Sequence, residues 1–119
     1  MISKTIAVIG SRGFDDYEYF KQRIKFFTQN IESYSFTSGG ANGADKFISD
    51  YCKEFGYELT EHLPDYNKYS GKVAPIKRNH LIVEDADLLI AFWDGVSRGT
   101  AYTLKLAEKK AIPIRIVKI

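Results

Sequence analysis

The chain has 119 residues, 45% of them hydrophobic and 27% charged, with a formal net charge of +2. This length fits one domain spanning residues 1–119, and the composition is that of a soluble globular protein that can bury its core without disulfides or metals. The small net charge excludes neither nucleic acid nor an anionic small molecule as a partner, because the clustering of charge matters more than its sum.

The cysteine and histidine content argues against disulfide and metal chemistry. Cys52 is the single cysteine, and its place in a helical pattern favours a buried side chain over a nucleophile. His62 and His80 lack metal-ligand spacing, so we expect neither a metal nor a cofactor. The sequence has no signal-peptide pattern and no apolar run close to the roughly 20 residues of a membrane span. We therefore expect a cytoplasmic protein without membrane contact.

The first part of the chain is typical of a strand, a turn and a helix. Thr5–Ile9 is a continuous apolar run rich in β-branched residues, as expected of a strand buried on both faces. A glycine-bearing turn follows at 10–13, and Asp15 with Glu18 forms a capping-box pattern. Apolar residues then recur at helical spacing at Phe20, Ile24, Phe27 and Ile31.

The second part repeats this order. Tyr34–Thr37 is predicted as a strand, and a glycine-rich turn at 38–45 separates it from a helix. The apolar face of that helix comprises Phe47, Ile48, Tyr51 and Phe55. Gly56 ends the helix, as glycine often does. The more polar segment Tyr57–Leu63 is predicted as a third strand at a sheet edge.

An irregular segment interrupts the pattern before the last two units. No period fits 64–73, so we predict a loop, of a length that is often functional. Pro75 then opens a helix at its first turn, and 87–92 is predicted as another buried strand. The apolar side of this helix is assigned to Ile76, Leu81, Ile82 and Val83.

The final unit contains the third glycine-bearing turn, at 93–99. Thr100 is predicted to cap a helix that runs to about Lys110, and Ile112–Val117 is predicted as the closing strand. The inward-facing residues of the helix are predicted to be Leu104, Ala107 and Ala111.

Alternating strands and helices predict an α/β fold. We expect a single Rossmann-like domain of three layers, with a mostly parallel five-stranded sheet in the order 3-2-1-4-5 and helices on both faces. Ligands bind such sheets beyond the carboxyl ends of the strands, where the strand order reverses. The turns after strands 1, 2 and 4 would then converge on one crevice.

These three turns combine glycine, hydroxyl and arginine side chains, which suits a phosphate-bearing ligand. Phosphate is expected on the 38–43 turn and at the helix start formed by Gly99 and Thr100, and Asp45 is expected to orient a sugar hydroxyl or a neighbouring N–H. The predicted ligand-binding residues are Gly10, Ser11, Arg12, Ser38, Gly39, Gly40, Ala41, Asn42, Gly43, Asp45, Tyr66, Arg78, Asn79, Trp93, Gly95, Ser97, Arg98, Gly99 and Thr100.

Structural roles are the alternative for several of these residues. Ser38 and Thr100 would serve only as helix caps, and Arg12 would pair with Asp15 or Asp16 at the surface. Trp93 or Tyr66 would stack on the base of the ligand, and packing alone is the alternative for Trp93, Tyr66 and Tyr69.

With these motifs in place, the chain resembles the SLOG superfamily, and within it the YspA/YpsA-like branch. The resemblance covers nearly the whole chain and rests on Gly10-Ser11-Arg12, Ser38-Gly39-Gly40-Ala41-x-Gly43-Ala44-Asp45, Arg78-Asn79 and Ser97-Arg98-Gly99-Thr100. It implies a Rossmann-like fold that binds a nucleotide or a nucleotide-derived ligand, to sense or sequester it. It also implies a homo-oligomer built by helix packing beside the site.

An enzymatic alternative comes from the LONELY GUY-type phosphoribohydrolases, which cut the N-glycosidic bond of a nucleoside monophosphate. Their catalytic glutamate closely follows a Gly-Thr pair, whereas here Glu108 lies two turns after Thr100. Arg78 matches the approximate place of that family's arginine. The remaining catalytic candidates are Asp45 and Asp94, because a general acid or base must lie within hydrogen-bond reach of its substrate.

A second alternative comes from the DNA-processing protein A family, which binds single-stranded DNA and has similar turns. Single-strand binding requires a basic groove with stacking aromatic residues. A modest groove of this kind would consist of Lys68, Lys72, Lys77 and Arg78 with Tyr66 and Tyr69. The low net charge makes nucleic acid a less favoured partner than a nucleotide.

Overall fold

The computed structural model describes residues 3–119 as one α/β domain. Its elements in chain order are β1 (Lys4–Gly10), α1 (Tyr17–Thr28), β2 (Tyr34–Ser38), α2 (Ala44–Phe55), β3 (Leu59–Glu61), α3 (Ala74–Asp85), β4 (Leu88–Trp93), α4 (Arg98–Lys110) and β5 (Ile114–Lys118).

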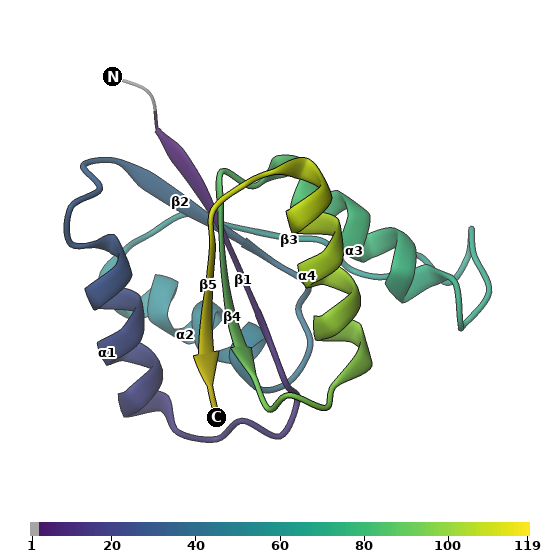
Figure 1. Ribbon diagram of the computed structural model, residues 1–119, viewed down its shortest axis with the longest axis horizontal. Coiled ribbons are helices and arrows are strands. Elements are labelled where there is room, and N and C mark those ends of the chain that lie inside the picture. The colour runs from purple at the N-terminus through teal and green to yellow at the C-terminus, as the bar shows by residue number, and fades with distance from the viewer. Residues whose placement is uncertain (1–2) are drawn as a thin grey trace.

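The sheet is five-stranded and parallel, in the order β3-β2-β1-β4-β5, which confirms the predicted topology. β1 lies at the centre, where Ala7 is in register with Thr37 of β2 and Leu89 of β4. Helices cover both faces, with α1 and α2 on one side and α3 and α4 on the other (Figure 1). The strand order reverses beside β1, so the turns that follow β1, β2 and β4 meet at one end of the sheet.

Alternation along the central strands divides the core in two. Ile6 and Val8 of β1 pack under α1 and α2, while Ala7 and Ile9 pack under α3 and α4. All four side chains are buried, as predicted for a strand covered on both faces. Phe20 of α1 is one of several aromatic residues that fill the first core. Burial on both faces fixes the position of β1, and therefore of the turn that follows it.

The start and end of α1 differ from the prediction. Asp16 is the N-cap, because its Oδ1 accepts a hydrogen bond from the Tyr19 amide at 3.0 Å. The predicted Asp15–Glu18 capping box is therefore wrong by one residue. The helix ends at Thr28, so Ile31 lies beyond it and packs against the core from the following loop.

The inward face of α3 also differs from the prediction. Ile82 and Val83 are buried as predicted. Ile76 and Leu81 are 42% and 47% exposed, however, and the buried row consists of Ala74, Arg78 and Ile82. These three are four residues apart, so they lie on one side of the helix. A buried arginine in that row is unexpected from sequence, and its side chain has an acceptor in the 38–43 turn, described below.

The boundaries of α4 also required correction. Ser97 is the N-cap residue and the helix begins at Arg98, so Thr100 lies within the first turn and is not the cap. Ala111 is the exposed C-cap, with a left-handed φ of 64°, so it does not face inward. β5 begins at Ile114 instead of Ile112 because residues 111–113 are needed to turn the chain back onto the sheet.

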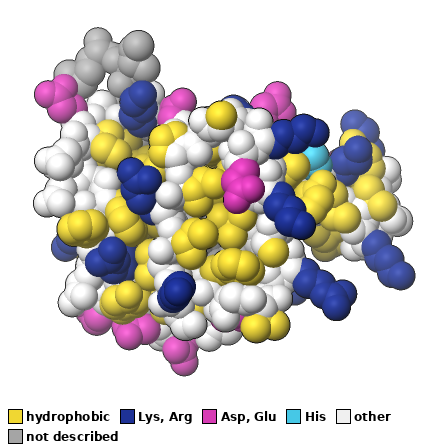
Figure 2. Space-filling model, viewed as in Figure 1, with side chains coloured by type: hydrophobic (Ala, Val, Ile, Leu, Met, Phe, Trp, Pro, Cys, Tyr) yellow, Lys and Arg dark blue, Asp and Glu magenta, His cyan; other side chains and the backbone are white. Residues whose placement is uncertain are grey.

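The segment between β3 and α3 projects from the body of the molecule (Figure 1). β3 lies at the sheet edge, as predicted, but spans only Leu59–Glu61 of the predicted 57–63, and 64–73 forms turns before α3. Lys68, Lys72 and Lys77 are exposed here, and Lys68 and Lys77 lie over the Tyr69 ring at 5.4 and 5.7 Å from its centroid. Lys and Arg side chains gather with apolar ones at this projecting end (Figure 2). We refer to residues 64–77 as the basic arm.

None of the helices in residues 3–119 has the length and the apolar composition required to cross a membrane.

Candidate functional site

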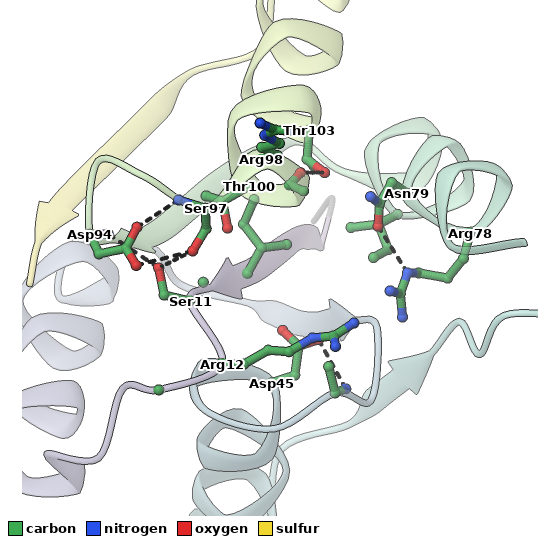
Figure 3. Close-up of a pocket in the computed structure, with 16 residues that line it drawn as sticks. Ser11, Arg12, Asp45, Arg78, Asn79, Asp94, Ser97, Arg98, Thr100 and Thr103 are labelled. Atoms are coloured by element: carbon green, nitrogen blue, oxygen red, sulfur yellow. Dashed lines mark hydrogen bonds between the residues drawn. The ribbon is translucent and has the colours of Figure 1, made fainter. Parts of the chain in front are cut away.

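A pocket of about 420 Å³ opens beyond the carboxyl ends of β1 and β4, where the sequence predicted a crevice (Figure 3). Its walls come from the turns after β1, β2 and β4, the first turn of α2, the middle of α3 and the N-terminal turns of α4. The lining residues are Ile9, Gly10, Ser11, Arg12, Gly13, Ala41, Asp45, Arg78, Asn79, Ile82, Asp94, Ser97, Arg98, Gly99, Thr100 and Thr103.

Hydrogen bonds join the turn after β1 to the turn after β4. The buried Ser11 Oγ accepts from the Asp94 amide at 3.2 Å and lies 3.0 Å from the Ser97 hydroxyl. Asp94 Oδ1 accepts from the amides of Val96 and Ser97, both at 2.8 Å. These amide hydrogen bonds, that of Ser97 above all, lower the pKa of the Asp94 carboxyl. Asp94 is therefore an ionised residue that orders its own turn, which makes it a poor proton donor.

Two glycines allow the turns to approach one another closely. A Cβ on Gly10 would lie 2.6 Å from the Phe92 carbonyl oxygen and 2.7 Å from Ala44 Cβ. Gly43 has a φ of 74°, and a Cβ there would collide with the Ser11 carbonyl oxygen. Side chains at these positions would push the turns apart and widen the pocket.

Arg78 extends from α3 to the turn after β2. Its Nη1 donates to the Gly39 carbonyl oxygen at 2.5 Å, and its Nε donates to Asn79 Oδ1 at 2.9 Å. The side chain is 8% exposed, and burial lowers the pKa of Arg78, although a guanidinium remains protonated. Over the described residues it forms no ion pair with a carboxylate. A buried cation held by neutral acceptors provides a site for an anionic ligand.

Asp45 lies across the pocket from the α4 start, in the first turn of α2 (Figure 3). Its Oδ2 accepts from the Ala41 amide at 3.1 Å, and the Gly39 amide also points to the carboxylate. Burial raises the pKa of Asp45 to about 6, with the two amides and Arg78 acting in the opposite direction. The amides of the glycine-rich turn are thus directed at a carboxylate of the same chain.

Within residues 3–119, the N-terminal turn of α4 provides unpaired amides at the pocket. The first helical hydrogen bond runs from the Ala101 amide to the Ser97 carbonyl, so the amides of Arg98, Gly99 and Thr100 precede it. The Ser97 hydroxyl is directed at Ser11 and Asp94 and not at these amides. Free amides and the helix dipole favour an anion at this end of α4.

Many of the predicted ligand-binding residues meet in this pocket. The predicted residues that line it are Gly10, Ser11, Arg12, Ala41, Asp45, Arg78, Asn79, Ser97, Arg98, Gly99 and Thr100. Arg12 lines the pocket, and within residues 3–119 it makes no ion pair with Asp15 or Asp16. The alternative of a surface ion pair at Arg12 is therefore wrong.

The structure places the other predicted residues outside the lining. Ser38 is fully buried at the end of β2 and caps no helix, because Gly43 is the N-cap of α2. Trp93 packs against the core and donates its Nε1 hydrogen to the Ser97 carbonyl at 3.1 Å. Tyr66 is 62% exposed in the basic arm. The remaining predicted residues outside the lining are Gly39, Gly40, Asn42, Gly43 and Gly95.

Sequence reasoning missed four lining residues, Ile9, Gly13, Ile82 and Thr103. Two of these follow from helical spacing, because Ile82 lies one turn after Arg78 and Thr103 one turn after Gly99. Thr103 Oγ1 donates to the Gly99 carbonyl at 3.0 Å, which fixes its side chain beside the α4 start. Both residues could therefore have been predicted from the sequence, because Arg78 and Gly99 were already assigned to the pocket.

The chain is similar to a protein of a bacteriophage. The chain is 33% identical over 82 residues to the gene 61 protein of Mycobacterium phage D29, and the match covers 64% of this chain. It spans 65% of the length of that phage protein. No family model matches the chain. No solved structure matches it significantly.

Proposed function

We propose that this protein binds a nucleotide or a nucleotide-derived ligand through its phosphate, and that it senses or sequesters this ligand in the pocket of Figure 3. One observation carries the proposal. Arg12, Arg78 and Arg98 converge on a pocket that also contains the unpaired amides of α4. Guanidinium groups and helix N-termini are both strong phosphate-binding groups in proteins.

We assign the phosphate to the start of α4, in the pocket that Arg12 and Arg98 also line. The sequence suggested the 38–43 turn as a second position, but the amides of Gly39 and Ala41 point to the Asp45 carboxylate. A phosphate there would meet a negative charge in place of free donors. At the helix start, Asp94 accepts from the amides of Val96 and Ser97, and the amides of Arg98, Gly99 and Thr100 stay available within the described residues, so this is the stronger of the two positions.

The size of the pocket supports a ligand no larger than a mononucleotide or dinucleotide fragment. Small-molecule sites in proteins usually have volumes of about 300–1,000 Å³, and this pocket of about 420 Å³ is at the lower end of that range. Trp93 and Tyr66 do not line it, so neither is assigned as a stacking partner for a base. The proposal therefore rests on phosphate recognition and leaves the base unspecified.

Calorimetric titration with the four ribonucleoside 5′-monophosphates and their diphosphates tests this proposal. Arg12→Ala should weaken binding by about 10-fold or more, because hydrogen bonds to a charged group contribute roughly 1.5–3 kcal/mol. Arg115→Ala is the matched control, because Arg115 is an exposed arginine on β5 that does not line the pocket. Equal affinities of the wild type and Arg12→Ala, or no binding by the wild type, would contradict the proposal.

A second function, hydrolysis of the N-glycosidic bond of a nucleoside monophosphate, is favoured by Asp45. A general acid or base works best when its pKa lies near the working pH, and burial raises the pKa of Asp45 to about 6 in a pocket that also holds Arg78. Incubation of the protein with each monophosphate, followed by chromatography for free base, tests this function. Release of base that Asp45→Asn abolishes would establish an enzyme, and the absence of free base would leave a binding protein.

A further inference from the structure

Asp45 is an unexpected residue in a pocket that binds phosphate. It is 7% exposed and lines the same cavity as Arg12, Arg78 and Arg98. A buried carboxylate repels a phosphate and is itself costly to desolvate. Its position therefore needs a reason other than contact with the phosphate.

The hydrogen bonds of Asp45 leave part of the carboxylate unused. An ionised carboxylate has about four acceptor positions on its two oxygens. Oδ2 accepts from the Ala41 amide at 3.1 Å, and the Gly39 amide also points to the carboxylate. Arg78 donates to the Gly39 carbonyl and to Asn79. The carboxylate thus keeps acceptor capacity on the side that lines the pocket (Figure 3).

We infer that Asp45 accepts hydrogen bonds from the sugar hydroxyls of the ligand while the phosphate lies at the start of α4, so that the protein selects ribose over a sugar without those hydroxyls. This inference rests on the proposed function, because it assumes a phosphate ester in the pocket. It assigns the opposite walls of one cavity to the two ends of a sugar phosphate.

The charge of the pocket favours a neutral hydroxyl over an ammonium group as the ligand group that donates to Asp45. An ammonium group on the ligand would gain from Asp45 but would be repelled by the guanidinium groups of Arg12, Arg78 and Arg98 in the same pocket. Asp94 offsets only part of this positive charge, because three guanidinium groups line the pocket against the two carboxylates of Asp45 and Asp94. A neutral donor avoids the repulsion, and a sugar provides neutral donors on the same small molecule as the phosphate.

The geometry of an amide at this position makes a sharp test possible. In Asp45→Asn, the side-chain oxygen must accept the Ala41 amide that Oδ2 accepts in the wild type. The side-chain NH₂ would then face the pocket, and it donates where the carboxylate accepted. The substitution therefore keeps the size and the loop contact of Asp45 while it removes the acceptor offered to a hydroxyl.

The experiment measures the affinities of two proteins, the wild type and Asp45→Asn, for two ligands that differ only in the sugar hydroxyls. Calorimetry at pH 7.5 would compare the ribonucleoside 5′-monophosphate that binds the wild type most tightly with its 2′,3′-dideoxy analogue. The dideoxy analogue should bind the wild type about 10- to 100-fold more weakly, in line with the strength of a hydrogen bond to a charged group. Asp45→Asn should weaken the binding of the ribonucleotide by a similar factor and leave the affinity for the dideoxy analogue unchanged.

The matched control is Asp50→Asn, the same substitution on α2 at a residue that pairs with Lys46 at 3.5 Å and does not line the pocket. It should change neither affinity. Equal binding of ribose and dideoxy nucleotides by the wild type would overturn the inference and leave the proposed function intact. The inference would also be overturned if Asp45→Asn reduced the affinities for both nucleotides by the same factor. If no nucleotide binds the wild type, the proposed function and the inference fail together.

Discussion

The Asp45 carboxyl destabilises the fold at neutral pH. Its pKa rises from 3.8 to about 6 on folding, mainly through burial, while Arg78 opposes the shift and Glu61 reinforces it. Between these two pH values the folded protein binds more protons than the unfolded chain, so the free energy of unfolding decreases as pH rises through this window. The full cost above pH 6 is roughly 3 kcal/mol. Such a cost is typical of a residue kept for ligand binding and not for stability.

We predict that Asp45→Asn removes this pH dependence. Because the amide does not ionise, the variant should gain about 1 kcal/mol in the free energy of unfolding relative to the wild type as pH rises from 5 to 8. Urea denaturation of both proteins at several pH values in that range measures the difference. Asp50→Asn should follow the wild type, and parallel pH profiles for wild type and Asp45→Asn would contradict a buried, ionised Asp45.

The contact between α3 and the turn after β2 depends on the absence of a side chain at Gly39. A Cβ there would lie 2.5 Å from Arg78 Nη1 and 2.9 Å from its Cζ. The end of an arginine side chain can move, so we predict that Gly39→Ala displaces Arg78 while the fold persists. Nucleotide affinity should decrease by about 10-fold or more through loss of one charged group.

Gly71→Ala is the control for this prediction, because a Cβ at Gly71 meets no atom within 4 Å and the residue lies in the basic arm. Calorimetry gives the affinities, and thermal unfolding shows whether each variant is folded. Full affinity in Gly39→Ala would indicate that Arg78 does not contact the ligand.

The elements that the sequence predicted correctly are those set by hydrophobic period and by the chirality of strand–helix–strand units. The strand order follows from such rules, and so does the convergence of three turns at one end of the sheet. The inward face of α3 was predictable only in part, because Ile82 and Val83 are buried as predicted but Arg78 is buried as well. Arg78 occupies a core-facing position that a polar residue normally avoids, and only the Gly39 carbonyl from another unit makes it acceptable.

The glycine-rich turn after β2 shows that the site, too, was only partly predictable from the sequence. Its sequence is typical of a turn whose amides bind a phosphate. In the structure the Ala41 amide instead binds Asp45, four residues later in the first turn of α2. Nothing in the composition of the turn distinguishes these outcomes, because both use the same backbone donors. The residues of the pocket were thus largely predictable, whereas the partners of its donors required the structure.

At the scale of the whole molecule, two groups of positive side chains bear on the kind of ligand, those of the pocket and those of the basic arm. The arginines of the pocket lie at the end of the central strands, and the lysines of the basic arm project away from them (Figures 1 and 2). Lys68, Lys72 and Lys77 do not line the pocket. A mononucleotide held by the pocket would therefore not contact the arm, whereas a single-stranded nucleic acid would engage both regions.

We predict that the triple variant Lys68→Ala, Lys72→Ala, Lys77→Ala keeps its affinity for a mononucleotide within about 2-fold, since screening at physiological salt limits charge effects beyond about 8 Å. Calorimetry at two salt concentrations tests this. For a single-stranded oligonucleotide that contacts the arm, the slope of log binding constant against log salt concentration should become shallower in the triple variant. The change is up to about 2, at roughly 0.7 for each lysine removed. If the triple variant instead lost mononucleotide affinity by 10-fold or more, the ligand would have to extend onto the arm, and a nucleic acid partner would become the better explanation of the whole surface.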